Sequence, residues 1–236
     1  MRVSIIDVGQ GQSVLLQHEE KYYLVDCGGE NDTMTADTVA NFLMSQGIFC
    51  LDGLILTHYD SDHVGAVLNL LTCIDVERIY IPDREDTSGV RKTIEMSRPE
   101  NISLIQDVSV LDLSGGRITL YPGNPDKDDN ESSVCVLFQS QDCDILITGD
   151  RSKTGERDLL QKTTLPELEL LIAGHHGSHL ATSADLLIAT RPQAVVISVG
   201  ANNRYGHPRE DLLERLAQFG CEIYRTDLQG TIIFRR

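Results

Sequence analysis

Apolar residues recur along this chain in short runs separated by polar segments, which indicates a mixture of strands and helices. Short apolar or alternating runs predict strands over residues 2–8, 13–17, 21–26, 53–57, 76–81, 102–105, 109–113, 117–121, 133–139, 143–148, 168–173, 194–199, 221–225 and 230–235. Segments with their apolar residues on one face predict helices over residues 35–46, 62–72, 88–97, 154–161, 182–189 and 208–218. The strands form two groups, each followed by helices, which predicts two sheets packed face to face with helices outside.

The length and composition of the chain set its broad class. Its 236 residues contain no Pro-rich or Gly/Ser-rich linker, so we expect one domain over residues 1–236. The six cysteines form no C-x-x-C pair and most lie in apolar surroundings, which favours buried thiols in a reducing compartment over disulfides. The sequence shows no signal peptide and no apolar stretch long enough to span a bilayer. These features predict a cytoplasmic protein without a membrane span.

The densest group of metal-binding side chains follows the apolar run at residues 54–56. His58, Asp60, Asp62 and His63 lie on the loop that leaves the C-terminal end of this predicted strand. Imidazole nitrogens and carboxylate oxygens are ligands that divalent transition metals prefer. The alternating spacing can aim one pair of these side chains at one ion and the other pair at a second.

Further metal-binding side chains follow other predicted strands. Asp150 closes the run at 145–150, and a histidine pair follows the strand at 168–173. Six of the seven histidines lie on loops of this kind: His58, His63, His175, His176, His179 and His207. Loops held by a rigid scaffold are where catalytic groups are commonly placed, so we expect these side chains to form one site.

The spacing of these motifs resembles that of the metallo-β-lactamase superfamily of metal-dependent hydrolases. The resemblance rests on His58-x-Asp60-x-Asp62-His63, on Thr148-Gly149-Asp150 and on the histidine pair. The segments at residues 6–13, 24–29, 130–133, 175–178 and 205–208 are similar to the hydrolase domain of ComEC, the competence DNA-channel protein. The resemblance covers nearly the whole chain and implies a fold of the α/β (α+β) class, the four-layer αββα sandwich.

The chain departs from the pattern of this branch at two positions. Gln12 stands where an Asp is usual, and Ala66 stands where a second Gly is usual. Asp60 replaces a His of the wider superfamily, which is the usual state in the ComEC-like branch. No His motif lies between His63 and Asp150, where many members place another ligand. Asn130 is therefore a further candidate near that gap.

The resemblance and the spacing together suggest roles for the site residues. We expect Asp150 to bridge two ions, with His58 and Asp60 facing one ion and Asp62 and His63 facing the other. One histidine of the pair completes the set. His175 is preferred because it comes first after the strand and Gly174 lets the backbone turn, and His176 is the alternative. Asp26 is expected to orient the metal loop from outside the ligand set.

Three residues are expected to take part in catalysis: Asp62 at the metal, and His207 and Ser178 through contacts with the substrate. His207 precedes Pro208, which we expect to open the last helix as its first residue. A histidine there can donate to a phosphate oxygen or protonate a leaving group. The alternatives are structural, since His207 could cap that helix and Ser178 could cap the helix near Thr182.

The chemistry expected of such a site is hydrolysis with two divalent ions, Zn or Mn, with Fe also compatible. Water bound to such an ion loses its proton near neutral pH and can attack an ester, so no nucleophilic side chain is needed. A phosphodiester is the expected substrate, and DNA is the one that the resemblance implies.

The net charge of −16 opposes a nucleic-acid substrate, because phosphate binding usually relies on Lys and Arg. A local basic mouth could offset it, formed by Arg151, Lys153, Arg191, Arg204 and Arg209. Two alternatives stay open. One is a hydrolase of a smaller ester, such as a phosphocholine ester, a cyclic nucleotide, a lactam or a thioester. The other is a non-catalytic, metal-stabilised domain that works with a protein partner.

Overall fold

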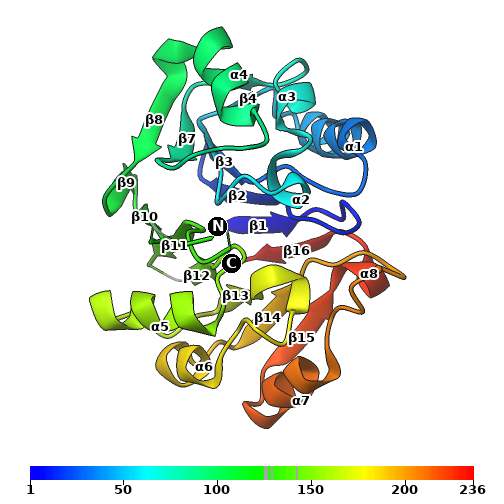
Figure 1. Ribbon diagram of the computed structural model, residues 1–236, viewed down its shortest axis with the longest axis vertical. Helices are drawn as coiled ribbons and strands as arrows, with labels where there is room; N and C mark the ends of the chain where they lie inside the picture. The colour runs from blue at the N-terminus through cyan, green and yellow to red at the C-terminus, as the bar shows by residue number, and fades with distance from the viewer. Residues whose placement is uncertain (125–126, 129, 142) are drawn as a thin grey trace.

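Two seven-stranded sheets lie face to face in the computed structural model, which describes residues 1–124, 127–128, 130–141 and 143–236 (Figure 1). The first sheet runs in the order β16 (Ile232–Arg235), β1 (Arg2–Ile5), β2 (Val14–His18), β3 (Lys21–Val25), β5 (Gly53–Ile55), β7 (Ile79–Pro82) and β8 (Ile102–Ile105). The second runs in the order β15 (Glu222–Arg225), β14 (Ala194–Ile197), β13 (Leu170–Ile172), β12 (Asp144–Ile147), β11 (Cys135–Ser140), β10 (Gly116–Tyr121) and β9 (Ser109–Leu113). A small sheet pairs β4 (Cys50–Leu51) with β6 (Asp75–Val76).

Helices cover the two outer faces. One outer face carries α1 (Asp32–Ser45), α3 (Val67–Leu70) and α4 (Val90–Ser97), and the other carries α5 (Lys153–Lys162), α6 (Ala184–Thr190) and α7 (Glu210–Gln218) (Figure 1). The shorter helices are α2 (Ser61–Val64), α8 (Thr226–Gln229), and the 3₁₀ turns η1 (Pro99–Asn101) and η2 (Gly174–Gly177). The predicted four-layer αββα sandwich is confirmed.

The continuous apolar runs of the central strands follow from these layers. In β5, Leu54 packs into the core under the first set of helices, whereas Ile55 packs between the two sheets. In β12, Ile145 faces the other sheet and Leu146 faces the second set of helices. Both faces of these strands are therefore buried, which is why every position is apolar rather than every second one.

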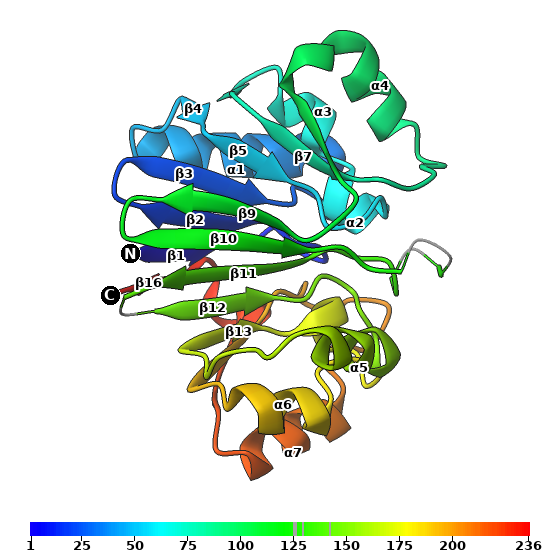
Figure 2. The ribbon, with the colours of Figure 1, turned by 90° about the vertical axis from the view of Figure 1, so that its left-hand side faces the viewer.

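The parallel strands point in one direction within each sheet. The strands β3, β5, β7 and β8 run parallel, as do β12, β13, β14 and β15. In Figure 2 the helix α2, which follows β5, lies at the end of the sheets opposite the two chain termini. The loops after β3, β5, β12, β13 and β14 bring their polar side chains together, as at the carboxyl edge of other parallel sheets.

Two helices differ from the prediction in ways that bear on the site. The helix expected over 62–72 is divided into α2 and α3, because the backbone N–H of Ala66 donates to Cys27 O rather than to a helical acceptor. The helix expected over 208–218 is α7, which begins at Glu210, so Pro208 lies before it and the prediction that Pro208 is its first residue is wrong. The N–H of Arg209 donates to Gly177 O, which ties the start of this helix to the loop after β13.

Within the described residues, no helix combines the length and the apolar character needed to cross a membrane. All six cysteines are free, and Cys27, Cys135 and Cys143 are buried.

Candidate metal centre

The loop that carries His58 to His63 is held by backbone hydrogen bonds to its neighbours. The N–H of Cys27 donates to His63 O at 2.8 Å, and the N–H of Gln12 donates to Asp62 O at 3.0 Å. A side chain on Gly28 could not be accommodated, because its Cβ would lie 2.3 Å from the backbone of Asp62 and His63. The metal loop therefore rests directly on the turns after β1 and β3.

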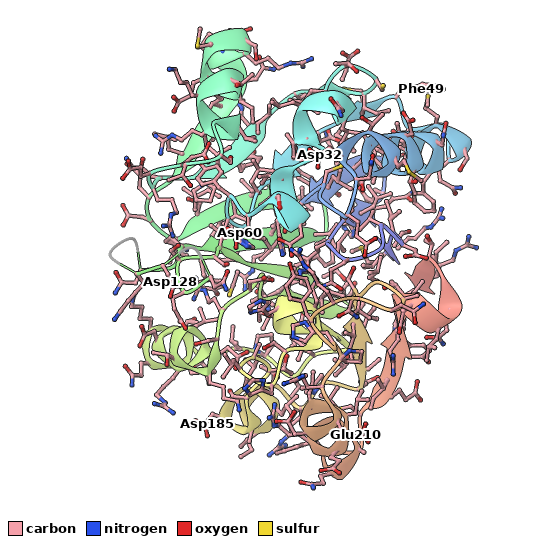
Figure 3. The ribbon with its side chains drawn as sticks, turned by 45° about the vertical axis from the view of Figure 1, so that its right-hand side comes forward. Asp32, Phe49, Asp60, Asp128, Asp185 and Glu210 are labelled. Atoms are coloured by element: carbon pink, nitrogen blue, oxygen red, sulfur yellow. The ribbon has the colours of Figure 1, made fainter. Side chains whose placement is uncertain are left out.

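Five side chains from three loops converge in a largely buried cluster. Two overlapping groups each place one possible ligand atom per residue within 4.8 Å of the others, and these are His58 with His63 and Asp150, and Asp62 with His63 and His176. The carboxylate of Asp150 lies 3.0 Å from His63 Nε2 and 3.9 Å from His176 Nε2. Asp60, which Figure 3 labels near the centre of the molecule, is more exposed and lies 3.7 Å from His58 Nε2.

The spacing of these atoms fits metal ligation. Two atoms bound to a tetrahedral ion at about 2.0–2.1 Å lie about 3.3 Å apart. His176 Nε2 lies 3.2 Å from His63 Nε2 and 3.3 Å from Asp62 Oδ2. His58 Nε2 is buried without a hydrogen-bond partner among the described residues, which is costly unless another group binds it.

All three histidine rings of the cluster are oriented by hydrogen bonds to residues that lie behind it. His63 Nδ1 lies 2.8 Å from Asp26 Oδ2, and His176 Nδ1 lies 3.0 Å from Ser198 O. The hydroxyl of Thr57 donates to Asp26, so it accepts from His58 Nδ1 at 3.0 Å. In each ring Nδ1 carries the proton, which leaves the lone pair of Nε2 for an ion.

Asp26 lies behind the cluster and belongs to neither group of possible ligands. Its carboxylate accepts from the N–H and the hydroxyl of Thr57 and from Gln12 Nε2, each at 2.8 Å. Asp26 has a φ of 61°, in the left-handed region that is rare for residues other than Gly. An Asp at position 12 would set a second carboxylate against this one, so the amide of Gln12 is a better partner here.

The charges of the cluster are strongly coupled. Burial disfavours the charged form of His63, but Asp150 and Asp26 outweigh it and raise the pKa of His63 well above its usual value. Burial likewise opposes the charge of Asp150, yet His63 and His176 hold its pKa well below the usual range. Burial lowers the pKa of His58 to about 4. Ions bound here would replace protons on His63 and His176, so binding is expected to release protons.

The histidine pair forms an unusual turn that favours His176 over His175. His175 and His176 both have positive φ values, 51° and 52°, and Gly177 follows with 85°. This turn carries the ring of His176 into the cluster, whereas His175 is partly exposed and lies 3.7 Å from Asp150 Oδ2 at the edge. The structure thus corrects the preference for His175, and the turn is made at residues 175–177 rather than at Gly174.

His207 lies at the mouth of the cluster. It lines a cavity of about 280 Å³ together with Asp60, Asp62, Asp150 and both histidines of the pair. Its ring lies 5.9 Å from that of His175, and its buried Nδ1 has no hydrogen-bond partner among the described residues. Burial, with His175 and His176 nearby, lowers the pKa of His207 to about 4. It is placed to contact a substrate, although the helix α7 begins three residues later.

Ser178 and Asn130 do not line this cavity. The hydroxyl of Ser178 accepts from Leu180 N at 3.2 Å within its own turn, and it is Ser183 that caps α6. The structure therefore supports neither expected role for Ser178. From the segment of Asn130 it is Ser133 that approaches the site, where its hydroxyl accepts from Asp150 N at 3.3 Å.

The expected basic mouth is reduced to two arginines. Arg151 is buried, and its guanidinium donates to the carbonyls of Ser133 and Tyr121. It lines a different groove of about 670 Å³, between α5 and β10, which contains none of the metal-binding side chains. Arg191 pairs with Glu167 at the end of α6. Arg204 and Arg209 are exposed beside His207.

Sequence reasoning gave no role to several residues that build the site. Thr57 and Ser198 fix two of the histidine rings, and Asn203 holds the loop that carries His207. Thr57 directly precedes His58 after β5, so its role could have been recognised in the sequence. Ser198 acts through its main-chain carbonyl, so its side-chain type does not reveal its role.

Comparison with known proteins agrees with this geometry. The family model described as "Metallo-beta-lactamase superfamily" matches residues 6–201. The chain belongs to the metallo-beta-lactamase superfamily. It is 30% identical to ComE operon protein 3 of Bacillus subtilis (strain 168), and the match covers 99% of this chain and 33% of that protein. It is 31% identical to competence protein ComA of Neisseria gonorrhoeae, covering 98% of this chain and 32% of that one.

The chain thus spans about a third of the length of these curated relatives. Among solved structures it is similar to the metallo-beta-lactamase fold protein YhfI from Bacillus subtilis, with a TM-score of 0.67, 13% identity, and coverage of 99% of this chain and 98% of that one. At this identity the likeness concerns the fold alone. The curated relatives indicate that, within the superfamily, the chain resembles the competence proteins.

Proposed function

We propose that this protein is a metal-dependent phosphodiesterase that acts on DNA. The observation that carries the proposal is the convergence of three Nε2 lone pairs, on His58, His63 and His176, with the carboxylates of Asp62 and Asp150. When bound, two divalent ions such as Zn²⁺ or Mn²⁺ would activate water and neutralise the charge of a phosphate group.

The residues of this chain divide the work as follows. The carboxylate of Asp150 lies within 4.0 Å of the Nε2 atoms of His58, His63 and His176. It is proposed to contact both ions, with His58 and Asp60 on one side and Asp62, His63 and His176 on the other. His207, on the open side, is proposed to bind a phosphoryl oxygen or to pass a proton to the leaving oxygen. Its ring lines the cavity together with Asp60, Asp62 and Asp150, which supports this role.

DNA is favoured as the substrate by the branch of the family. One relative is named a competence protein, and the sequence motifs resemble the hydrolase domain of a competence DNA-channel protein. These points support DNA for this chain as a proposal. We further propose that residues 1–236 form one domain and that the protein works in the cytoplasm, as its free cysteines suggest.

A smaller phosphodiester is the second candidate. The net charge is −16, and only Arg204 and Arg209 of the expected basic mouth are exposed beside His207. Long DNA needs many phosphate contacts for affinity, whereas a small diester needs only the metal site.

A metal screen distinguishes the two candidates. The purified protein would be loaded with Zn²⁺, Mn²⁺ or Fe²⁺ and incubated with plasmid DNA, single-stranded DNA and bis(p-nitrophenyl) phosphate. We expect cleavage of DNA that stops with chelator and is absent in Asp150→Asn. If every form of DNA stays intact while the small diester is hydrolysed, the smaller substrate is correct. If no ester is hydrolysed with any metal, the proposed activity is wrong.

A further inference from the structure

A second cavity opens directly beside the metal cavity. It measures about 440 Å³, and it shares Gln10, Ser61, Asp62 and Tyr205 with the cavity that contains His207. Its size lies within the range of small-molecule sites, about 300–1,000 Å³. The two cavities therefore share part of their walls, and the second lies next to the metal centre.

The loop over residues 200–207 forms one wall of this cavity and is held by Asn203. Its side-chain Nδ2 donates to Gly200 O at 2.9 Å and to His207 O at 2.6 Å. Its Oδ1 accepts from Tyr205 N at 3.2 Å and from His207 N at 3.0 Å. A single amide thus fixes the backbone on both sides of the residues that face the cavity.

This wall presents a planar, partly charged surface. Tyr205 is 45% exposed, and the Arg204 guanidinium lies 4.9 Å from the centroid of its ring. The guanidinium also donates to the Tyr205 hydroxyl at 2.7 Å. The Tyr205 ring stacks with His207 at 5.8 Å, which links this surface to the metal centre. Nucleobases stack on tyrosine rings and on arginine guanidinium planes.

The charges that line the second cavity favour an uncharged chemical group over a second anionic group. Its lining includes the carboxylates of Glu30 and Asp62, and Arg204 is the single cation among its described lining residues. Glu30 is exposed and can accept a hydrogen bond from the amino group of a base. A second phosphate group would instead meet two negative charges.

We propose that this cavity is a recognition subsite for the nucleoside attached to the phosphate at the metal centre, with its base against the Arg204–Tyr205 pair. The inference rests on the proposed phosphodiesterase function and names the part of the substrate that is recognised. In it, Asn203 is a positioning residue that acts through the loop over residues 200–207.

Binding to the subsite can be measured without turnover. The chain has no Trp, so Tyr205→Trp carries a single indole as a reporter. Phe49→Trp is the matched control, because Phe49 is 63% exposed and lies beyond α1, far from Asp60 (Figure 3). With Zn²⁺ present, we expect adenosine and thymidine 5′-monophosphates to quench Tyr205→Trp, whereas deoxyribose 5-phosphate does not. None of the three compounds should change the fluorescence of Phe49→Trp. Equal responses to nucleotide and sugar phosphate, or no response, would overturn the proposal.

Turnover gives a second, independent readout. The substrates are a short single-stranded oligonucleotide, the same oligonucleotide with abasic residues, and bis(p-nitrophenyl) phosphate. Tyr205→Ala should lower kcat/KM on the intact oligonucleotide by about tenfold more than on the abasic one, the order of effect of removing one stacking ring. Asn203→Asp keeps both acceptor bonds but loses both donor bonds, so it should also reduce the preference for a base.

These outcomes separate the two proposals. If no substrate is hydrolysed by the wild type, the proposed function fails, while quenching of Tyr205→Trp still decides whether the subsite binds nucleotides. If DNA is cleaved but both variants lower the intact and abasic rates equally, the proposed function stands and the subsite is wrong. The zinc content of each variant, measured alongside, shows that the metal centre is intact.

Discussion

Asp26 and His63 are joined by a hydrogen bond of 2.8 Å between Oδ2 and Nδ1, and both side chains are completely buried. The opposite nitrogen of the ring, Nε2, lies 3.0 Å from Asp150 Oδ1. The turn after β3 therefore determines which nitrogen of His63 faces the metal centre, although Asp26 is not itself in the cluster.

Asp26→Asn should weaken metal binding without removing a ligand. The amide has no charge to favour Nδ1–H, and loss of such a partner typically costs about 10–100-fold in metal affinity. Competition with a chromogenic chelator measures the change. Asp185→Asn is the control, since Asp185 is an exposed residue of α6 in a long ion pair with Arg157. Equal zinc affinity in wild type and Asp26→Asn would contradict the orienting role.

Asp150→Asn and His207→Ala should separate ligation from substrate contact. A neutral amide neutralises two cations poorly, so Asp150→Asn is expected to lose most of its metal and nearly all activity. His207→Ala should retain its metal and lose turnover by about 100-fold, as on removal of a proton-transfer group. Elemental analysis after dialysis, combined with rates, tests both. Equal metal loss in the two variants would make His207 a ligand.

The salt dependence of DNA affinity measures how many phosphate groups the protein contacts, and we expect this number to be small. For single strands the slope of log affinity against log salt is about −0.7 per phosphate contact. Arg209→Gln is expected to reduce the slope by about that amount. Arg191→Gln should leave it unchanged, because Arg191 pairs with Glu167 away from the cavity. Fluorescence anisotropy over a salt series provides the measurement, and a slope unaffected by any variant would exclude these contacts.

Glu156 should make the stability of the protein depend on pH. Its buried carboxylate accepts from Thr182 N at 2.5 Å and Ser183 N at 2.7 Å, and burial raises its pKa to about 7 despite these bonds and nearby Arg215. Because the folded-state pKa is raised, the contribution to the free energy of unfolding is full below about pH 4.5 and is lost as the pH rises through about 7. The shift corresponds to about 3 kcal/mol.

Urea denaturation at about pH 5 and about pH 8 tests this dependence. Glu156→Gln should lower the free energy of unfolding by about 1–3 kcal/mol at the lower pH, since one backbone N–H loses its acceptor. It should also show a smaller loss between the two pH values than the wild type. Glu167→Gln, at an exposed position, is the control. An unchanged pH dependence in Glu156→Gln would show that another group is responsible.

Much of the fold and the clustering of possible ligands could be predicted from the sequence, because both follow from patterns that are local in the chain. Strands buried on both faces are continuous apolar runs, and the loop from His58 to His63 contains three of the five clustered side chains in six residues. The wider arrangement followed from the family resemblance. The division of the helix at Ala66 was not predictable, since its cause is a hydrogen bond to Cys27, which is remote in sequence.

The errors share a physical origin in the directions of side chains. Arg151 follows Asp150 directly, but its guanidinium donates to the carbonyls of Ser133 and Tyr121, so Arg151 turns away from the cavity. The sequence favours His175 over His176 as the ligand, whereas the structure favours His176. The left-handed backbone conformations of these two residues cause the difference, and they cannot be recognised in the sequence. Ser178 was assigned a role from its motif, while its hydroxyl is used within its own turn.

The pairing of β1 with β16 places the two termini side by side, with Met1 N donating to Arg236 O at 2.8 Å. Figure 2 shows both termini at the end of the sheets opposite α2. A tag or a solid support attached at either end is therefore directed away from the cavities, and immobilised protein keeps them open to solution. A circular permutant that joins Arg236 to Met1 through a short linker requires no rearrangement of the sheet.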